Sequence, residues 1–267
     1  MTKALTFIIP VRHQNNAKDW NKLKSNLSST AKSIASQKNG SWKGIVVANH
    51  GADLPPLPEG FEVKRVDFPP NTLHEQGNVS KEQFYEAFRI DKGQRVLAGM
   101  LHAGPMQHVM IVDDDDFVSN ELAGLAVQQP TANGWYIRDG YVWGEGSNYV
   151  YEFSDFSKLC GTCYVIRADL YELPATFEQA SEEYIKRMLG SHIVIRDHLA
   201  QQNTPLSPLP FVGAVYRVGH AGAHSQSTGV FKQYFPRGLL KQPFELLRRL
   251  LRLKYLSSNI RRDYFGA

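Results

Sequence analysis

Apolar residues in the first part of the chain occur in two kinds of pattern. Short continuous runs rich in β-branched residues lie within Leu5–Arg12 and Gly44–Gly51, and Phe61–Phe68 follows a proline-rich loop as a third expected strand. Between the first two, from about Trp20 to Gln37, apolar residues recur at helical spacing. The continuous runs predict buried strands and the helical spacing predicts a helix. This alternation predicts an α/β fold with a mixed, mostly parallel sheet flanked by helices.

A further apolar run, His108–Val112, stops abruptly at four consecutive aspartates, Asp113–Asp116. This pattern is typical of a buried strand that delivers acidic side chains to its carboxyl end, where open α/β sheets bind ligands. Adjacent carboxylates repel one another, so water, hydrogen bonds or a cation must compensate them. The run therefore indicates a divalent metal site, although a solvated acidic turn or a structural Ca²⁺ site would leave the same pattern.

Further elements are expected on both sides of the aspartates. Two successive helices precede them, one from about Lys81 and one opened by Asp91–Arg95. Two cations of the second helix, Lys92 and Arg95, could face phosphates or solvent. After the aspartates the pattern predicts a short helix, two strands of a smaller, antiparallel layer, a strand and two helices, at Ser119–Val127, Trp135–Arg138, Gly140–Trp143, Leu159–Arg167, Phe177–Leu189 and Ile193–Gln201.

Other chemically capable side chains stand later in the chain. Glu182, Glu183 and Asp197 lie on predicted helices, where acids are either solvated surface groups or candidate bases. His220 and His224 lie among glycines, which favours either a metal or phosphate contact or a surface loop. A single Cys-x-x-Cys, at Cys160 and Cys163, is more typical of small packed core residues than of a redox pair.

Composition and charge narrow the class. The chain has 267 residues, of which 42% are hydrophobic and 21% charged, and is typical of a soluble globular protein. It shows no apolar stretch long enough for a bilayer span or a signal peptide, so we expect a cytoplasmic protein. The segment 237–267 carries eight Lys or Arg against two acids. The near-neutral remainder argues against general nucleic-acid binding.

Within the basic tail, Phe244–Leu256 has apolar residues at helical spacing with cations largely between them. Such a basic amphipathic helix could lie on an anionic membrane surface, which would make the protein peripheral to the inner face of the membrane. It could equally pack on the body of the protein or on another subunit.

Taken together, these motifs resemble glycosyltransferases of the GT-A fold, close to the family 2-like enzymes. The resemblance covers roughly residues 5–227. Its most specific part is a Lys-Gly segment that leads into a DxD-type motif, and two strands support it. These segments are Asp91–Arg95, Ala103–Gly104, Met110–Asp116, Phe7–Arg12 and Gly161–Arg167.

The resemblance implies a role for each matching position. Asp113 and Asp115 match the outer carboxylates, which contact the ribose and a Mn²⁺ or Mg²⁺ ion, and Asp114 and Asp116 offer the alternative register. Asn49 stands where the family usually has an acid that reads the base. The donor would further contact Pro10, Val11, Arg12, Lys92 and Arg95. A late metal ligand would be His220 or His224, and the catalytic base would be Glu183, with Glu182 and Asp197 as rivals.

The implied activity is metal-dependent transfer of a sugar, with inversion, from a UDP- or GDP-sugar to a hydroxyl of a glycan or lipid-linked acceptor, in bacterial surface polysaccharide synthesis. We expect a glycosyltransferase domain at 1–236, with a nucleotide-binding half (1–118) and an acceptor half (119–236), followed by the tail at 237–267. The alternatives are a sugar-phosphate nucleotidyltransferase, against which the lack of glycine in Pro10–Asn16 counts, and a non-catalytic carbohydrate- or Ca²⁺-binding module.

Overall fold

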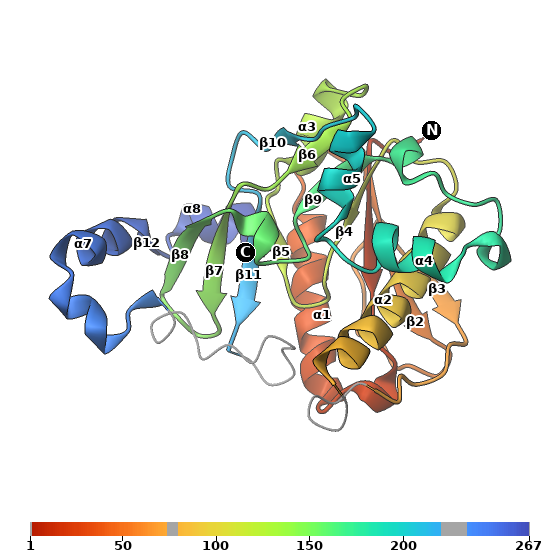
Figure 1. The fold of residues 1–267 in the computed structure, drawn as a ribbon, viewed down its shortest axis with the longest axis horizontal. Coiled ribbons are helices and arrows are strands. Elements are labelled where there is room, and N and C mark those ends of the chain that lie inside the picture. The colour runs from red at the N-terminus through yellow and green to blue at the C-terminus, as the bar shows by residue number, and fades with distance from the viewer. Residues whose placement is uncertain (1, 74–79, 220–233, 267) are drawn as a thin grey trace.

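The computed structural model describes residues 2–73, 80–219 and 234–266, which form two sheets with helices around them (Figure 1). The larger sheet has the strand order β10-β6-β9-β4-β1-β2-β3 and the smaller one the order β12-β8-β7-β11-β5. In the larger sheet β3, β2, β1 and β4 are parallel, and β9 runs antiparallel to β4 and β6. The predicted architecture, a mostly parallel sheet flanked by helices with a smaller second layer, is confirmed.

The strands of the larger sheet are β1 (Leu5–Pro10), β2 (Trp42–Asn49), β3 (Phe61–Val66), β4 (His108–Ile111), β6 (Gly134–Tyr136), β9 (Tyr164–Arg167) and β10 (Ser207–Pro208). Those of the smaller sheet are β5 (Phe117–Val118), β7 (Asp139–Gly144), β8 (Tyr149–Ser154), β11 (Ala214–Val218) and β12 (Leu253–Tyr255). The helices are α1 (Trp20–Ala35), α2 (Lys81–Ala103), α3 (Leu122–Gln128), α4 (Glu182–Tyr184), α5 (Ile195–Gln201), α7 (Pro243–Arg252) and α8 (Ser258–Ile260).

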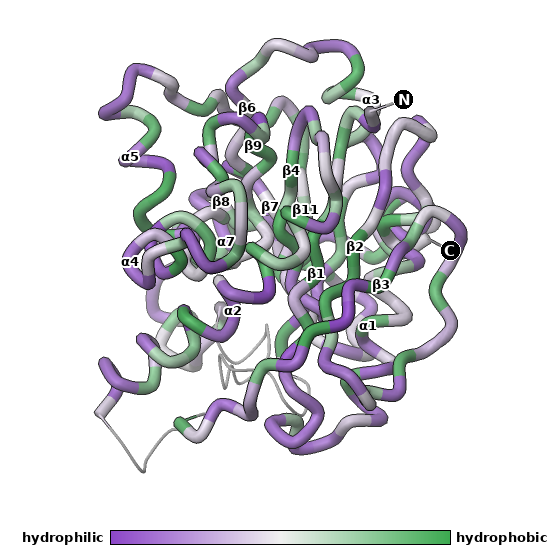
Figure 2. The backbone as a smooth tube through the Cα atoms, turned by 90° about the vertical axis from the view of Figure 1, so that its right-hand side faces the viewer, coloured by the Kyte–Doolittle hydropathy of each residue, from purple (hydrophilic) through white to green (hydrophobic). Residues whose placement is uncertain are grey.

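The core lies between the central strands and the long helices. Figure 2 shows the central strands as largely apolar segments, as expected for strands covered on both faces. Helix α2 packs closely on β1 and β2 because Gly99 has no side chain there. A Cβ atom at this position would come within 2.7 Å of Val47 Cγ2 and 3.0 Å of Ile8 Cγ2.

Helix α1 is tied by hydrogen bonds to the segment that follows β4. The Thr30 hydroxyl donates to the Asp114 carbonyl oxygen at 3.2 Å, and the Ser33 hydroxyl donates to the Val118 carbonyl oxygen at 3.2 Å. Both hydroxyl groups are fully buried. The backbone of the aspartate run is therefore held between β4 and α1.

Several element predictions are wrong in detail. The two helices expected before the aspartates are one, α2, because Asp91–Arg95 continues the helix. The strand at Gly134–Tyr136 pairs with β9 in the larger sheet and not in the smaller layer. The helix expected at Phe177–Leu189 is divided into a 3-10 turn (Phe177–Gln179), α4 and a π-helical turn (Ile185–Leu189).

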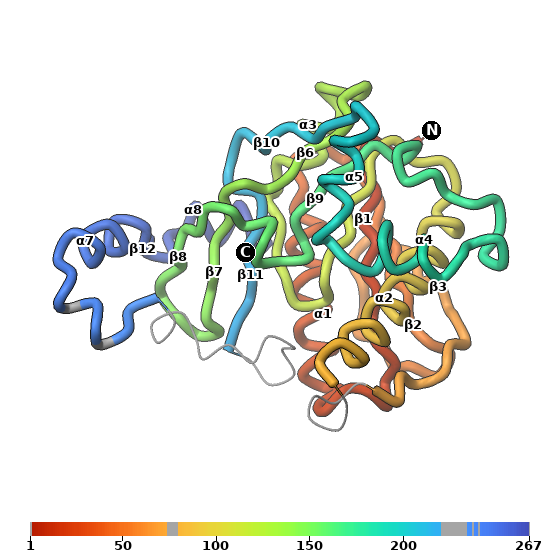
Figure 3. Tube along the Cα trace, viewed as in Figure 1, coloured from red at the N-terminus to blue at the C-terminus, as the bar shows by residue number. Residues whose placement is uncertain are grey.

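The tail contributes to the smaller sheet. After α7, β12 pairs with β8, and the buried Tyr264 donates from its hydroxyl to the Val212 carbonyl oxygen at 2.7 Å. Figure 3 shows this blue C-terminal part beside β7 and β8 of the smaller sheet. None of the helices in residues 2–73, 80–219 and 234–266 is long and apolar enough to cross a membrane.

Candidate active site

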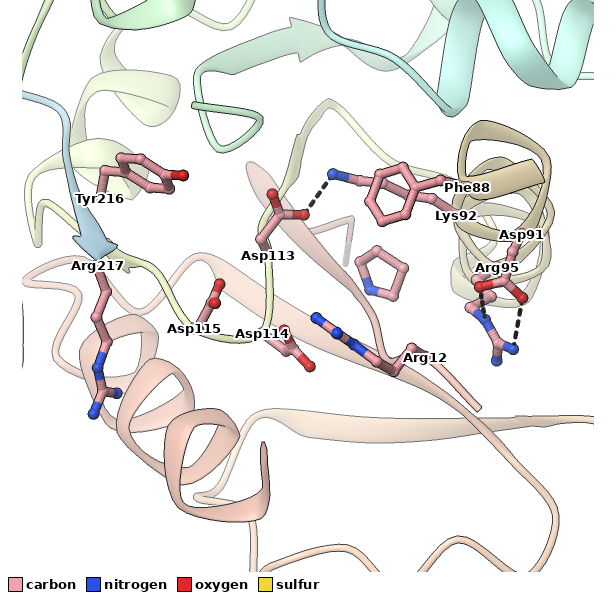
Figure 4. Close-up of a pocket in the computed structure, with 11 residues that line it drawn as sticks. Arg12, Phe88, Asp91, Lys92, Arg95, Asp113, Asp114, Asp115, Tyr216 and Arg217 are labelled. Atoms are coloured by element: carbon pink, nitrogen blue, oxygen red, sulfur yellow. Dashed lines mark hydrogen bonds and ion pairs between the residues drawn. The ribbon is translucent and has the colours of Figure 1, made fainter. Parts of the chain in front are cut away.

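A pocket lies at the point where the strand order of the larger sheet reverses. The chain runs from β1 outward to β2 and β3, and then returns through α2 to β4 on the other side of β1. The carboxyl ends of β1 and β4 thus meet at a topological switch point, where open α/β sheets bind ligands. The pocket is lined by Pro10, Arg12, Phe88, Asp91, Lys92, Arg95, Asp113, Asp114, Asp115, Tyr216 and Arg217 (Figure 4).

Lys92 and Asp113 form an ion pair in this pocket. Lys92 Nζ lies 2.5 Å from Asp113 Oδ1, and the two side chains are 13% and 33% exposed. Burial alone would lower the pKa of Lys92, but the Asp113 carboxylate holds that pKa above its usual value. Lys92 is therefore charged at neutral pH. Figure 4 shows the Arg12 side chain pointing toward the aspartates that line the pocket.

Gly161 explains why this ion pair fits beside the loop that precedes β9. A Cβ atom at residue 161 would lie 2.8 Å from Asp113 Oδ2 and 3.1 Å from Lys92 Nζ. The backbone of this loop therefore approaches the pair so closely that a side chain would displace it.

The aspartates divide into two pairs by exposure. Asp113 and Asp115 are partly exposed, whereas Asp114 is 7% exposed and Asp116 is fully buried. Asp116 does not line the pocket. Its carboxylate accepts hydrogen bonds from the Thr162 hydroxyl at 2.7 Å and the Cys160 thiol at 3.1 Å. Burial first, and the negative charges of Asp115 and Asp113 second, raise the pKa of Asp116 well above its usual range.

Thr162 holds both ends of the aspartate turn, Asp113–Asp116, by hydrogen bonds. Its hydroxyl oxygen also accepts a hydrogen bond from the Asp113 backbone N–H at 2.9 Å, so a single side chain links the first aspartate to the last. The backbone N–H of Arg217 donates to Asp116 Oδ1 at 3.3 Å. Sequence reasoning did not single out Thr162. Cys160 and Cys163 are free and buried, as the packing interpretation of the Cys-x-x-Cys expects.

Arg95 joins the pocket wall to the end of β2. Its side chain is 1% exposed and donates to both carboxylate oxygens of Asp91, at 3.1 and 2.9 Å. It also donates to Asn49 Oδ1 at 2.7 Å, while Asn49 Nδ2 donates to the Phe68 carbonyl oxygen at 2.6 Å. Asn49 is buried and does not line the pocket, so it reaches the site only through Arg95.

Arg217 lies at the other end of the pocket, on β11 of the smaller sheet. Its Nη2 donates to Glu145 Oε1 at 2.6 Å, and the guanidinium lies 5.6 Å from the centre of the Trp143 ring. Figure 4 shows this side chain running away from the aspartates. Arg217 therefore closes the wall of the pocket and is already engaged by Glu145.

The residues predicted as bases do not line this pocket. Glu182 and Glu183 are 67% and 68% exposed and pair with Lys186 at 3.2 Å and Arg187 at 3.8 Å. Glu183 borders a separate depression that includes Ser191. Asp197 is exposed on α5. The structure thus separates these three carboxylates from the aspartates.

His192 lies closer to the site than the predicted bases and was not singled out from the sequence. It lines a small pocket that shares Lys92 with the first one and includes Gly161. Burial, and then the positive charge of Lys92, lowers the pKa of His192 to about 4. Its imidazole is therefore neutral at pH 7. The only signal in the sequence is its place in the Gly-Ser-His break between two helices.

A metal ion in this pocket would need several oxygen or nitrogen ligands from nearby side chains. Among the described residues, no group of three or more His, Cys, Asp or Glu side chains is arranged to hold one. His220 and His224 lie outside the described residues. Four carboxylates, those of Asp91, Asp113, Asp114 and Asp115, nevertheless line one pocket, and carboxylate oxygens are the ligands that Mg²⁺ and Mn²⁺ prefer. The chemistry of these side chains fits such an ion, provided that further ligands complete the shell.

Comparison with known proteins found matches in structure only. No protein family model matches the chain, and no curated protein does. It is similar to S. aureus TarS 1–349 (13% identity, TM-score 0.44), covering 81% of this chain and 60% of that one. It thus spans three fifths of TarS 1–349, and 37% of a longer TarS chain.

Two further solved structures are similar to the chain. One is glucosyl-3-phosphoglycerate synthase from Mycobacterium tuberculosis, in complex with Mn²⁺, uridine diphosphate and phosphoglyceric acid (13% identity, TM-score 0.36, 92% of this chain and 78% of that one). The other is the glycosyltransferase GlyE of Streptococcus pneumoniae TIGR4 (11% identity, TM-score 0.31, 97% and 55%).

Proposed function

We propose that the chain is a glycosyltransferase that moves a sugar from a nucleotide-diphosphate sugar to a hydroxyl of an acceptor. The observation that carries the proposal is the pocket at the switch point, where Asp113, Asp114 and Asp115 face Arg12 and Lys92. A diphosphate needs cations around its oxygens, and a metal ion bound to it needs carboxylates. This pocket offers both kinds of group at the end of the sheet where such ligands bind.

In this proposal Arg12 and Lys92 bind the phosphate oxygens and orient the donor. A Mn²⁺ or Mg²⁺ ion held by Asp113 and Asp115 would neutralise the negative charge that develops on the departing diphosphate. The exposure of these two side chains supports this register over that of Asp114 and Asp116. Asp116 would not contact the donor; its hydrogen bonds to Thr162 and to the Arg217 backbone would keep the aspartate turn in shape.

The attacking hydroxyl must lose its proton to a nearby base. We propose His192 for this role, since its neutral imidazole borders Lys92 and Gly161 at the edge of the site. Glu183, with Glu182 and Asp197, stays a rival prediction. Loss of turnover in His192→Gln, with donor binding and the activity of Glu183→Gln retained, would support His192; the reverse pattern would support Glu183.

The finer assignments complete the proposal. The donor would be a UDP- or GDP-sugar, transferred with inversion to a glycan or lipid-linked acceptor in bacterial surface polysaccharide synthesis. The segment between β1 and α1 contains no glycine, unlike the phosphate loop that a nucleotidyltransferase would use. The site therefore favours transfer of the sugar over synthesis of the nucleotide sugar.

The test is calorimetric titration of UDP and GDP into the protein with and without Mn²⁺. We expect metal-dependent binding of one nucleotide, weakened at least about tenfold in Asp113→Ala/Asp115→Ala. The matched control is Asp53→Ala/Asp169→Ala, which removes two carboxylates that are 75% and 64% exposed and lie outside the pocket. Absence of binding with either nucleotide and any metal would instead support a non-catalytic module.

A further inference from the structure

Helix α7 presents a continuous apolar face to solvent. Phe244, Leu247, Leu250 and Leu251 are 88%, 57%, 47% and 68% exposed. Positions 244, 247 and 251 follow the spacing that places side chains on one side of a helix, and Leu250 flanks them. Soluble proteins rarely expose large apolar groups as a contiguous patch without a partner.

The opposite side of α7 is fixed to the body of the protein. Arg249 Nη1 donates to the Tyr234 carbonyl oxygen at 2.6 Å, and Arg249 Nε donates to Glu245 Oε1 at 2.7 Å. Tyr234 is itself buried and stacks on Tyr151 of β8, with ring centres 4.3 Å apart. The apolar face thus has a defined outward orientation and is not a loose end of the chain.

Cations border this face. Arg248 and Lys254 have side chains that are 66% and 45% exposed. From Lys241 to Lys254 the sequence has five Lys or Arg and a single acid, Glu245. The carboxylate of Glu245 is engaged by both Arg248 and Arg249 and is 24% exposed, so little negative charge remains on this surface.

We propose that α7 docks on an anionic lipid bilayer, with its axis in the plane of the membrane surface. The apolar side chains would enter the boundary between headgroups and acyl chains, and the bordering cations would meet lipid phosphates. Charge complementarity favours this occupant over a second copy of the chain, because pairing two such helices would bring two cationic surfaces together. Figures 1 and 3 show α7 at the edge of the molecule, away from the larger sheet.

This inference is independent of the proposed sugar transfer, because α7 contributes nothing to the pocket. If both hold, docking places the pocket beside a membrane that can carry a lipid-linked acceptor.

The test is cosedimentation of the full chain with phosphatidylcholine vesicles that contain either no or about one third phosphatidylglycerol. We expect at least about tenfold stronger partitioning onto the anionic vesicles, reduced at about 0.5 M salt. Phe244→Ser/Leu251→Ser should lower this partitioning at least about tenfold. The matched control, Val63→Ser/Val127→Ser, removes apolar side chains that are 36% and 42% exposed elsewhere, and should bind as the wild type does.

Three results would overturn the proposal: equal binding to both kinds of vesicle, no binding to either, or full binding by the α7 variant. Sedimentation of the protein without vesicles tests whether a second copy of the chain covers this face instead. A dimer that the α7 variant abolishes would assign the face to that second copy. Circular dichroism of both variants shows whether each remains folded, and the substituted side chains are exposed, so we expect that they do.

Discussion

The Thr162 hydroxyl is predicted to hold the aspartate run in its active shape, and the substitution Thr162→Val tests this. Valine keeps the shape of the fully buried side chain but removes the hydroxyl. Two hydrogen bonds are lost, one donated to Asp116 at 2.7 Å and one accepted from the Asp113 backbone N–H at 2.9 Å. A buried hydrogen bond to a charged group contributes about 1.5–3 kcal/mol, and an unpaired buried N–H costs about 1 kcal/mol or more. We therefore expect a loss of about 2.5–4 kcal/mol in the free energy of unfolding.

Urea denaturation measures this loss, with Thr162→Ser as the control that keeps the hydroxyl and removes only a methyl group. The serine variant should lose about 1 kcal/mol. The pKa of Asp116 is raised in the folded state, so ionising this group costs stability as pH rises above its usual value of 3.8. Since the Thr162 hydrogen bond favours the ionised form, the gap between the valine variant and the wild type should widen as pH rises. A valine variant as stable as the serine variant would refute the role of the hydroxyl.

Three further predictions concern the side chains around the pocket. Gly161→Ala places a Cβ 2.8 Å from Asp113 Oδ2, so the nucleotide affinity measured by calorimetry should fall about tenfold. The melting temperature should change little, because the ends of the flexible Asp113 and Lys92 side chains can move away from the new methyl group. His192 has a pKa of about 4, so it is protonated more readily in the unfolded chain. The folded protein should therefore lose stability as pH falls from 6.5 toward 4, by at most about 3 kcal/mol. Thermal unfolding measured against pH should show a smaller loss of stability at acid pH in His192→Asn than in the wild type. Lys92→Met removes the ion-pair partner of Asp113, so Mn²⁺ should bind more tightly to this variant in the absence of nucleotide. Calorimetry should show no such gain in the control Lys24→Met, whose ion pair with Asp53 lies outside the pocket.

The strands that form the site could be predicted from the sequence because they are buried on both faces. Such positions favour apolar residues, so β1, β2 and β4 read as largely apolar runs. The partners of a strand are set by tertiary contacts, so the local sequence of β6 does not show that it pairs in the larger sheet. The division of α2 into two helices was wrong because Asp91–Arg95 looks like a polar helix start. In the structure these polar side chains satisfy one another inside a continuous helix.

The chemistry of the site could be predicted only in kind. Four identical residues in sequence do not reveal which carboxylates face the pocket, since this depends on Thr162 and on the Arg217 backbone, which are distant in the chain. Exposure likewise separates Glu182 and Glu183 from the pocket, and no local pattern distinguishes such acids from a buried base. His192 stayed unnoticed because its environment is made by residues from other elements.

If the chain binds a nucleotide-diphosphate sugar and a metal ion as proposed, the ion pair between Lys92 and Asp113 predicts that the two binding events are coupled. Asp116 is satisfied by neutral donors, whereas Asp113 depends on the cation Lys92, at 2.5 Å. In the proposed reaction, a metal ion that took Asp113 as a ligand would release Lys92 toward a phosphate, and a phosphate that took Lys92 would release Asp113 toward a metal. Each ligand therefore removes the competitor of the other. By thermodynamic linkage the two affinities must rise by the same factor, and couplings of this kind are typically about 5- to 150-fold. On this proposal, the ion pair in the pocket would keep both charges compensated until donor and metal replaced it together.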